Sequence, residues 1–415
     1  MVRDVIILGS TGSIGTQALD VIDHHKDSFR VVGLSAGGGQ IDRLADQVVA
    51  WAVPVVAVAT ELAADQLTRA LRQRGRSGTR VLVGPGASSE LTGAGADVVL
   101  NAITGFAGLE STLAVLAAGS TLALANKESL VAGGRLVTAA AAPGQIVPVD
   151  SEHSAFAQAL RGGRATEVER LILTASGGPF RGWSRADLRH VTAAQALNHP
   201  TWQMGRVVTI NSSTLVNKGL ELIEAALLFD VGWDRIQVVV HPQSMVHSMV
   251  EFVDGATIAQ ASPPDMRLPI ALGLAWPRRL PGVGRPIDWS QATAWTFEPL
   301  DDVTFPAVEL ARRVGQAGGT LPAVFNAANE VCVDAFCAGQ IGFLDIVDTI
   351  AAVVDRYEHR PTDAAASLSL EAIRADDAWA RTAAAALITP GASATEPPRW
   401  SDQPDRRDST KAVAA

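Results

Sequence analysis

The sequence has few cysteines, no excess of positive charge and no long apolar run. Its two cysteines, Cys332 and Cys337, stand in a helical-looking stretch without a histidine at ligand spacing, which argues against a disulfide framework or zinc site and favours two small buried residues. The formal net charge of −9 argues against a nucleic-acid surface. No apolar run reaches the roughly 18 residues of a membrane span, and no signal peptide is evident. We therefore expect a cytoplasmic protein that binds neither nucleic acid nor membrane.

What the sequence has is length and apolar content: 415 residues, 47% of them hydrophobic, are enough for two or three domains. Over the first 150 residues, short runs rich in Val, Ile, Leu and Ala alternate with helical stretches. Nearly continuous apolar runs are typical of strands buried on both faces, and their alternation with helices predicts a parallel α/β sheet. The predicted strands are DVIILGS, RVVGLSA, PVVAVAT, RVLVG, DVVLNAI, TLALANK and QIVPVD.

The pattern changes after residue 150. Residues 151–277 combine alternating strands with loops rich in Gly, Ser and Pro, which predicts an α+β domain. Residues 278–304 have the composition of a linker, and residues 305–388 show apolar side chains at three and four spacing, which predicts a C-terminal helical-bundle domain. Residues 389–415 carry too little apolar surface to pack, so we expect a disordered tail.

The first predicted strand runs into GSTGSIG, with glycines at 9, 12 and 15. Residues without a Cβ let the backbone of a strand-to-helix turn approach a pyrophosphate, whose charge then lies at the helix N-terminus. Residues 1–150 are therefore predicted to form a Rossmann-like dinucleotide-binding domain, although a purely structural turn could use the same glycines. The second strand ends in LSAGGGQ without the acid that binds the ribose of NAD, which favours NADP. Arg43 is either a partner for the 2′-phosphate or a solvated helix charge.

The run PVDSEHSA places Asp150 and Glu152 directly after an apolar strand. In an extended segment these two carboxylates would point the same way while Ser151 faces aside. Converging carboxylates suit a hard cation such as Mg²⁺ or Mn²⁺, and the carboxyl ends of parallel strands are where such sites lie. The alternative is a solvated strand end with two acids.

The run NSSTLVNKGLELIEA predicts a helix with a polar stripe. Glu221 follows Asn217 by four residues and Lys218 by three, with Glu224 one turn further on. Such a stripe is usually the wet face of an amphipathic helix. However, the hydroxyls and free amides of residues 212–214 at the expected helix start would, with Lys218, suit a phosphate.

Two loops complete the set of candidate site segments. TASGGPFRGW offers Ser176 directly before two flexible glycines, and NHPTWQMG offers His199 and Trp202. These two side chains could close over a ligand as a lid, or could simply pack.

Taken together, these motifs resemble one enzyme family over residues 4 to about 358, that of 1-deoxy-D-xylulose 5-phosphate reductoisomerase. The motifs that carry the resemblance are GSTGSIG, LANKESLV, PVDSEHSA, TASGGPF, HPTWQMG, NSSTLVNKGLELIEA, HPQSMVHSMV and PPDMRLPI, in this order. The resemblance implies a homodimer whose chains each have an NADPH domain, a catalytic domain and a C-terminal helical domain. It also implies isomerisation and reduction of the sugar phosphate to 2-C-methyl-D-erythritol 4-phosphate in the non-mevalonate isoprenoid route.

The resemblance further assigns three groups of site residues. The divalent metal, Mg²⁺, Mn²⁺ or Co²⁺, would be held by Asp150, Glu152 and Glu221. Catalytic and substrate contacts would come from Lys127, Ser151, Glu152, Ser176, His199, Ser212, Asn217, Lys218 and Glu221. NADPH contacts would come from Thr11, Gly12, Ser13, Ile14, Gly37, Gln40, Asn126, Glu128 and Gly205. The AGGG run at 36–39 departs from the family, because many members place Lys and Asn there, near the 2′-phosphate.

Two other interpretations stay open on the sequence alone. One is a different NADP-linked dehydrogenase that uses the glycine turn without a metal, in which case activity would survive a chelator. The other is a non-enzymatic nucleotide sensor whose polar stripe is a partner surface, and turnover of NADPH with a ketose phosphate would argue against it.

Overall fold

The structure is a computed structural model that describes residues 2–93, 95–202, 204–359 and 368–388. The predicted tail, 389–415, lies outside these residues. The chain divides into two compact units: unit 1 comprises residues 1–175 and 224–296, and unit 2 comprises residues 176–223 and 297–415. The chain passes from unit 2 back into unit 1 within helix α10 (Val216–Phe229).

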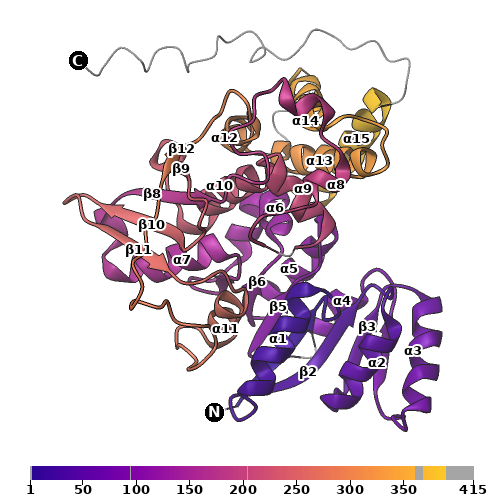
Figure 1. Ribbon diagram of the computed structural model, residues 1–415. Coiled ribbons are helices and arrows are strands. Elements are labelled where there is room, and N and C mark those ends of the chain that lie inside the picture. The colour runs from indigo at the N-terminus through magenta and orange to yellow at the C-terminus, as the bar shows by residue number, and fades with distance from the viewer. Residues whose placement is uncertain (1, 94, 203, 360–367, 389–415) are drawn as a thin grey trace, which may run out of the picture. The chain divides into compact units, whose positions relative to one another are not determined.

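Unit 1 begins with a parallel sheet in the order β4–β3–β2–β1–β5–β6–β7; its strands β2, β3, β5 and β6 are labelled in Figure 1. All seven strands predicted from the apolar runs are present. Their bounds are β1 (Arg3–Leu8), β2 (Phe29–Ala36), β3 (Val55–Val58), β4 (Arg80–Val83), β5 (Val98–Asn101), β6 (Thr121–Leu124) and β7 (Ile146–Pro148). The direction of winding reverses between β1 and β5, so a crevice for a ligand is expected at the carboxyl ends of these strands.

Helices cover both faces of this sheet, which explains the continuous apolar runs. Val5 and Ile7 of β1 belong to a core that also includes residues of α1, α2, α3 and α11. Gly33 of β2 faces Ile6 and Leu91 of α4, which covers the other face. The helices of this part are α1 (Ser13–His24), α2 (Ile41–Ala50), α3 (Glu61–Gln73), α4 (Ala87–Thr92), α5 (Leu109–Ala117), α6 (Lys127–Ala140) and α11 (Arg267–Ala275), with the 3₁₀ turn η1 (Phe106–Gly108).

Unit 1 also contains strands of a second, mixed sheet in the order β11–β10–β8–β9. Helix α7 (Ser151–Ala159) packs against β10 and β11. The bounds are β8 (Val168–Ala175), β9 (Ile236–Val240), β10 (Val246–Phe252) and β11 (Thr257–Ala261), with the 3₁₀ turns η2 (Leu160–Gly162), η3 (Ala165–Glu167) and η5 (Trp233–Arg235).

Unit 2 is mainly helical, as predicted for the C-terminal part. α13 packs against α9, α12, α14 and α15. The elements are η4 (Asp187–His190), α8 (Ala193–Ala196), α9 (Arg206–Ser213), the first part of α10, β12 (Glu298–Pro299), α12 (Ala307–Ala317), α13 (Leu321–Cys337), α14 (Phe343–Glu358) and α15 (Leu370–Ile388). Cys332 is buried on α13 and Cys337 half-buried, and both are free thiols. Burial raises the pKa of the Cys332 thiol to about 12, as expected for an inert core residue.

The predicted fold class, a Rossmann-like parallel sheet followed by α+β and helical parts, is confirmed. In the described part of the chain, every helix is too short or too polar to cross a membrane.

Candidate active site

Two neighbouring strands, β6 and β7, bring together the first site residues. The strands pair in parallel, so the turns that follow them lie at one edge of the sheet. Lys127 starts helix α6 after β6, and Asp150 follows β7; the Lys127 Nζ atom lies 2.7 Å from a carboxylate oxygen of Asp150. Lys127 is almost buried, at 7% exposure, so this pair is shielded from water.

The local conformation of Asp150 and Glu152 differs from the prediction. Strand β7 ends at Pro148, and Asp150 is the N-cap of helix α7, where its side chain accepts a hydrogen bond from the Glu152 backbone N–H at 3.3 Å. The prediction that these residues form an extended segment was therefore wrong. Asp is a favoured N-cap because its carboxylate satisfies a free N–H of the first turn, and here it precedes a helix that begins at Ser151. Ser151 also does not face aside, since its hydroxyl donates to the Glu152 carboxylate.

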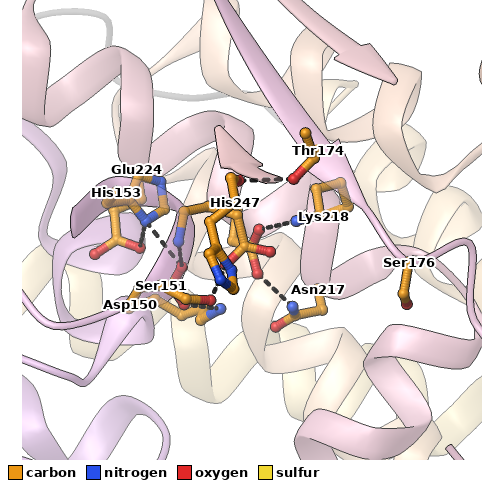
Figure 2. Close-up of polar contacts among 12 residues, drawn as sticks. Asp150, Ser151, His153, Thr174, Ser176, Asn217, Lys218, Glu224 and His247 are labelled. Carbon is orange, nitrogen blue, oxygen red and sulfur yellow. Dashed lines mark hydrogen bonds and ion pairs between the residues drawn. The ribbon is translucent and has the colours of Figure 1, made fainter. Parts of the chain in front are cut away.

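Helix α7 also carries His153, which joins Asp150 to the second half of α10. Its Nδ1 atom lies 3.3 Å from Asp150 and 3.1 Å from Glu224, and both contacts are drawn as dashed lines in Figure 2. His153 and Glu224 have no exposed surface. The ligand atoms of Asp150, His153 and Glu224 all lie within 4.8 Å of one another.

The electrostatic balance of this cluster fits a divalent cation. Burial alone would raise the pKa of Asp150, but the Lys127 ammonium and the His153 ring outweigh it and hold that pKa well below the ordinary value. Asp150 is thus ionised at neutral pH. Three carboxylates, those of Asp150, Glu152 and Glu224, accompany one ammonium and one imidazole, and carboxylate oxygens are the donors that Mg²⁺ and Mn²⁺ prefer.

The glycine turn after β1 has the geometry of a pyrophosphate cradle. Gly9 has φ +80°, and a Cβ there would lie 2.5 Å from the backbone oxygen of Ala102; a Cβ at Gly15 would lie 2.4 Å from the Gly9 oxygen. Gly12 is the N-cap of α1 and has no side chain to cover the free N–H groups of that helix. The predicted cofactor residues Thr11, Gly12, Ser13 and Ile14 occupy this turn and the first turn of α1.

The other predicted cofactor residues lie in three places. Gly37 and Gln40 form the turn between β2 and α2, where Gln40 is the N-cap. Asn126 caps α6, accepting from the Ser129 N–H at 2.6 Å and donating to the Gly105 oxygen at 2.9 Å, while Glu128 is buried in the first turn. Gly205 belongs to unit 2, where it is the N-cap of α9.

In unit 2, the polar stripe of α10 forms as predicted. The Asn217 amide and the Lys218 ammonium both donate to the Glu221 carboxylate. The stripe is not a wet helix face, since Lys218 and Glu221 are 4% and 1% exposed. Because Glu221 and Glu224 are three residues apart on one helix, their side chains leave α10 on the same side.

The expected helix start at residues 212–214 was wrong. Ser212 and Ser213 end helix α9, and α10 begins only at Val216. Between the helices Leu215 has φ +61°, a conformation that few side chains other than glycine adopt. Ser212 therefore offers its hydroxyl but not a helix N-terminus.

The two predicted loops meet within unit 2. The His199 Nδ1 atom accepts from the backbone N–H groups of Thr201 and Trp202, at 3.1 and 2.9 Å, so its proton lies on Nε2. Nε2 then donates to the Ser176 hydroxyl at 3.2 Å. The same loop packs on the end of α9, because a Cβ on Gly178 would lie 2.9 Å from the Ser212 oxygen. Ser176, His199 and Ser212 are thus gathered in one region.

Models of one enzyme family match most of the chain. The model described as 1-deoxy-D-xylulose 5-phosphate reductoisomerase matches residues 5–134, that of its C-terminal domain matches residues 146–229, and that of the DXP reductoisomerase C-terminal domain matches residues 261–383. The 1-deoxy-D-xylulose 5-phosphate reductoisomerase of Cutibacterium acnes is 67% identical, over 94% of this chain and 99% of its own. This chain belongs to the 1-deoxy-D-xylulose 5-phosphate reductoisomerase family.

Solved structures of reductoisomerases agree. That of Zymomonas mobilis in complex with NADPH has a TM-score of 0.85 and 41% identity, with 94% of this chain and all of that one covered. Another, with NADPH, fosmidomycin and magnesium, has a TM-score of 0.87 and 37% identity over 93% of this chain and 98% of its own. The predicted NADPH and magnesium match what these reductoisomerases contain.

The predicted activity follows from the family. The chain is an oxidoreductase of isoprenoid biosynthesis that isomerises and reduces 1-deoxy-D-xylulose 5-phosphate to 2-C-methyl-D-erythritol 4-phosphate with NADPH. A metal-free dehydrogenase and a non-enzymatic nucleotide sensor, the two alternatives, do not fit this family.

Two buried histidines, His153 and His247, were not predicted as site residues, although both lie inside family motifs. His153 follows Asp150 in PVDSEHSA by three residues, which is the spacing of one helical turn and could have indicated a contact. His247 on β10 donates from Nε2 to the Ser262 oxygen at 3.0 Å and lines a small cavity with Ser151 and Asp265. The Thr174 hydroxyl of β8 donates to the His247 backbone oxygen at 2.7 Å, which links β8 to β10 at this point (Figure 2).

Proposed function

We propose that this reductoisomerase binds its divalent metal through Asp150, Glu152 and Glu221, at the turn after β7. The observation that carries the proposal is the cluster of Asp150, His153 and Glu224. It brings two carboxylates together around one imidazole, and the His153 and Glu224 side chains are fully buried. Glu221 stands one turn before Glu224 on α10, so it supplies a further carboxylate from the same side of that helix. When bound, the metal polarises the carbonyl and hydroxyl oxygens of the sugar phosphate.

The chain's own residues would then orient the substrate and move its protons. The Lys127 Nζ atom lies 2.7 Å from Asp150. Its positive charge would lie beside the reacting oxygens of the substrate and would partly balance the charge of the carboxylates at this turn. The Ser151 hydroxyl, next to the Glu152 carboxylate, offers a donor and acceptor at the same turn. We also propose, as predicted from the sequence, an NADPH-binding domain over residues 1–150, a catalytic domain over 151–277, a linker over 278–304 and a helical domain over 305–388.

We place the phosphate of the substrate in unit 2, at Ser176, Ser212, Asn217, Lys218 and His199. The support is local: His199 bonds to Ser176, and the Ser176 loop packs on Ser212. The hydroxyls of Ser176 and Ser212 can donate to phosphate oxygens, and Lys218 adds positive charge. His199 and Trp202 would act as the lid that limits access of water.

We propose two further properties, a homodimer and a cytoplasmic location. The homodimer is supported by β11, which lies at the edge of its sheet with Thr257 and Ile258 exposed and so offers unpaired backbone groups to a second copy. Light scattering after size-exclusion chromatography should give twice the mass of one chain. The cytoplasmic location is supported by the use of NADPH and a phosphorylated substrate, and cell fractionation would test it.

The main test is oxidation of NADPH with 1-deoxy-D-xylulose 5-phosphate, with Mg²⁺ and with a chelator. Turnover should require the metal, and Mn²⁺ and Co²⁺ can be compared with Mg²⁺ in the same assay. Glu221→Gln keeps the side-chain shape but removes a charge from the ligand set, so both metal affinity and turnover should fall steeply. Glu169→Gln, at an exposed residue of β8, is the matched control. Unchanged turnover of Glu221→Gln at ordinary Mg²⁺ would show that Glu221 is not a ligand.

A further inference from the structure

Helix α2 is fixed to the glycine turn by two side chains one helical turn apart. Gln47 donates to the Ser10 backbone oxygen at 2.9 Å and accepts from the Ser10 hydroxyl at 2.9 Å, both in buried surroundings. Arg43, four residues earlier, donates from a terminal nitrogen to the Thr11 backbone oxygen at 3.2 Å. Residues four apart share a helix face, so this face of α2 is held against the turn that cradles the pyrophosphate.

The position of Arg43 coincides with the place where the adenosine ribose is expected. In a dinucleotide site of this kind the pyrophosphate lies at the start of the first helix, and the adenosine ribose lies beyond the end of the second strand. Arg43 belongs to the helix that follows β2 and reaches back to Thr11 in the first turn. Its guanidinium therefore lies between the two turns, and the turn at Gly37 and Gly39 leaves open space, with no atom within 4 Å of an added Cβ.

The charges around Arg43 leave it available to an anion. Two acids of the same helix, Asp42 and Asp46, pair with Arg74, at 3.2 and 2.8 Å. Among the residues that the structure describes, Arg43 itself makes no ion pair, and its side chain is exposed. The end of β2 carries Ser35 and Ala36 rather than an acid that would repel a phosphate.

We propose that Arg43 binds the 2′-phosphate of NADPH and is the residue that selects NADPH over NADH in this chain. The guanidinium has five N–H groups in a planar fork that matches phosphate oxygens, and the bond to Thr11 uses one of them. The tether orders the side chain before the ligand arrives, which lowers the entropy cost of binding. The inference rests on the use of NADPH by this family, and it explains how a Gly-Gly-Gly turn can accept a 2′-phosphate.

The test is equilibrium binding by calorimetry, without substrate or metal, to the full chain. The probes are NADPH, NADH, adenosine 2′,5′-bisphosphate and 5′-AMP. Arg43→Gln should weaken binding of the two 2′-phosphorylated probes by about 10- to 100-fold, the size of a charge-assisted contact, and leave NADH and 5′-AMP nearly unchanged. Arg43→Lys keeps the charge but not the fork, so it should give a smaller loss.

Arg69→Gln is the matched control, because Arg69 is an exposed arginine of α3 in the same unit and its substitution changes the net charge equally. It should bind all four probes as the unaltered chain does. Equal losses of affinity for NADPH and NADH in Arg43→Gln would show that Arg43 only positions the Thr11 turn. Unchanged binding of both would show that Arg43 does not contact the cofactor. Either result overturns the inference, while the enzyme activity stands. If the unaltered chain does not prefer NADPH, the cofactor assignment fails and the inference fails with it.

Discussion

The Nδ1 atom of His153 lies 3.1 Å from a carboxylate oxygen of Glu224, and neither side chain has any exposed surface. The same nitrogen lies 3.3 Å from Asp150. A ring held between two carboxylates in this way fixes the orientation of Asp150, the proposed metal ligand. If Asp150 binds the metal as proposed, Glu224 acts on that site through His153.

Glu224→Gln should therefore weaken metal binding although Glu224 is not proposed as a ligand. The substitution preserves the shape but removes the charge that faces His153, and loss of such an outer partner typically costs about 10- to 100-fold in metal affinity. We expect the Mg²⁺ concentration for half-maximal activity to rise by this factor, while the Michaelis constant for NADPH stays unchanged. A magnesium dependence equal to that of the unaltered enzyme would contradict this role.

The fold could be predicted well because its signals are local. Each strand of the parallel sheet is an apolar run, since both faces are covered by helices, and the polar stripe at Asn217, Lys218 and Glu221 follows from helical spacing alone. The contact between His153 and Glu224 joins segments about 70 residues apart, and nothing in the local sequence marks it. It depends on how the chain returns to unit 1 through α10.

Two predictions about the site were wrong because the sequence signals for the local conformation were conflicting or absent. The apolar run QIVPV favoured an extended chain, whereas the capping preference of Asp150 began a helix one residue later. The helix start was predicted at residues 212–214, but the break between α9 and α10 falls at Leu215, which is not a helix-breaking residue, so nothing in the sequence marked the true start.

Lys218→Ala should impair more than phosphate binding. Lys218 is buried and donates to Glu221, so its removal leaves a buried carboxylate without its cation, which typically costs about 3–5 kcal/mol of stability. We expect a clear loss in the free energy of unfolding, measured by urea denaturation, together with weaker substrate binding. Stability equal to that of the unaltered chain would contradict the buried pair.

Ser212→Ala tests the phosphate position without that complication. Ser212 is half-buried at the end of α9, so loss of its hydroxyl should barely change stability. If the hydroxyl donates to the phosphate, substrate binding should weaken by about 2- to 12-fold, from about 0.5–1.5 kcal/mol, with NADPH affinity unchanged. Substrate and NADPH affinities that both stay unchanged would remove Ser212 from the phosphate site.

The loop of His199 and Trp202, the proposed lid, should respond to acid through His199. Burial lowers the pKa of His199 below its ordinary value of 6.5, so the neutral ring is the form that the fold stabilises. The contribution of the neutral ring to the free energy of unfolding is fully present above pH 6.5 and is lost as the pH falls through the lowered pKa. Protonation also puts a proton on Nδ1, which then cannot accept from Thr201 and Trp202.

An NMR titration can follow the His199 ring and the Thr201 and Trp202 amides together, with His199→Gln to assign the ring signal. All three should change with one midpoint below 6.5. A midpoint at or above 6.5, or amides that do not follow the ring, would show that His199 does not hold the lid loop.

The last prediction concerns the AGGG turn and how its cofactor preference can be changed. Gly38 is a poor position for a new side chain, because its φ is +107° and a Cβ there would lie 2.7 Å from the Cβ of Ala63. Gly39 has no such restriction, since its φ is not in the left-handed region and an added Cβ meets no atom within 4 Å. Gly39→Lys should therefore lower the Michaelis constant for NADPH and leave that for NADH nearly unchanged, because only NADPH carries the extra phosphate. Gly39→Asp should shift the preference toward NADH by repulsion of the 2′-phosphate. If both variants keep the original ratio of the two cofactors in steady-state assays, the turn does not lie beside the 2′-phosphate, and the adenosine end of NADPH must be placed elsewhere.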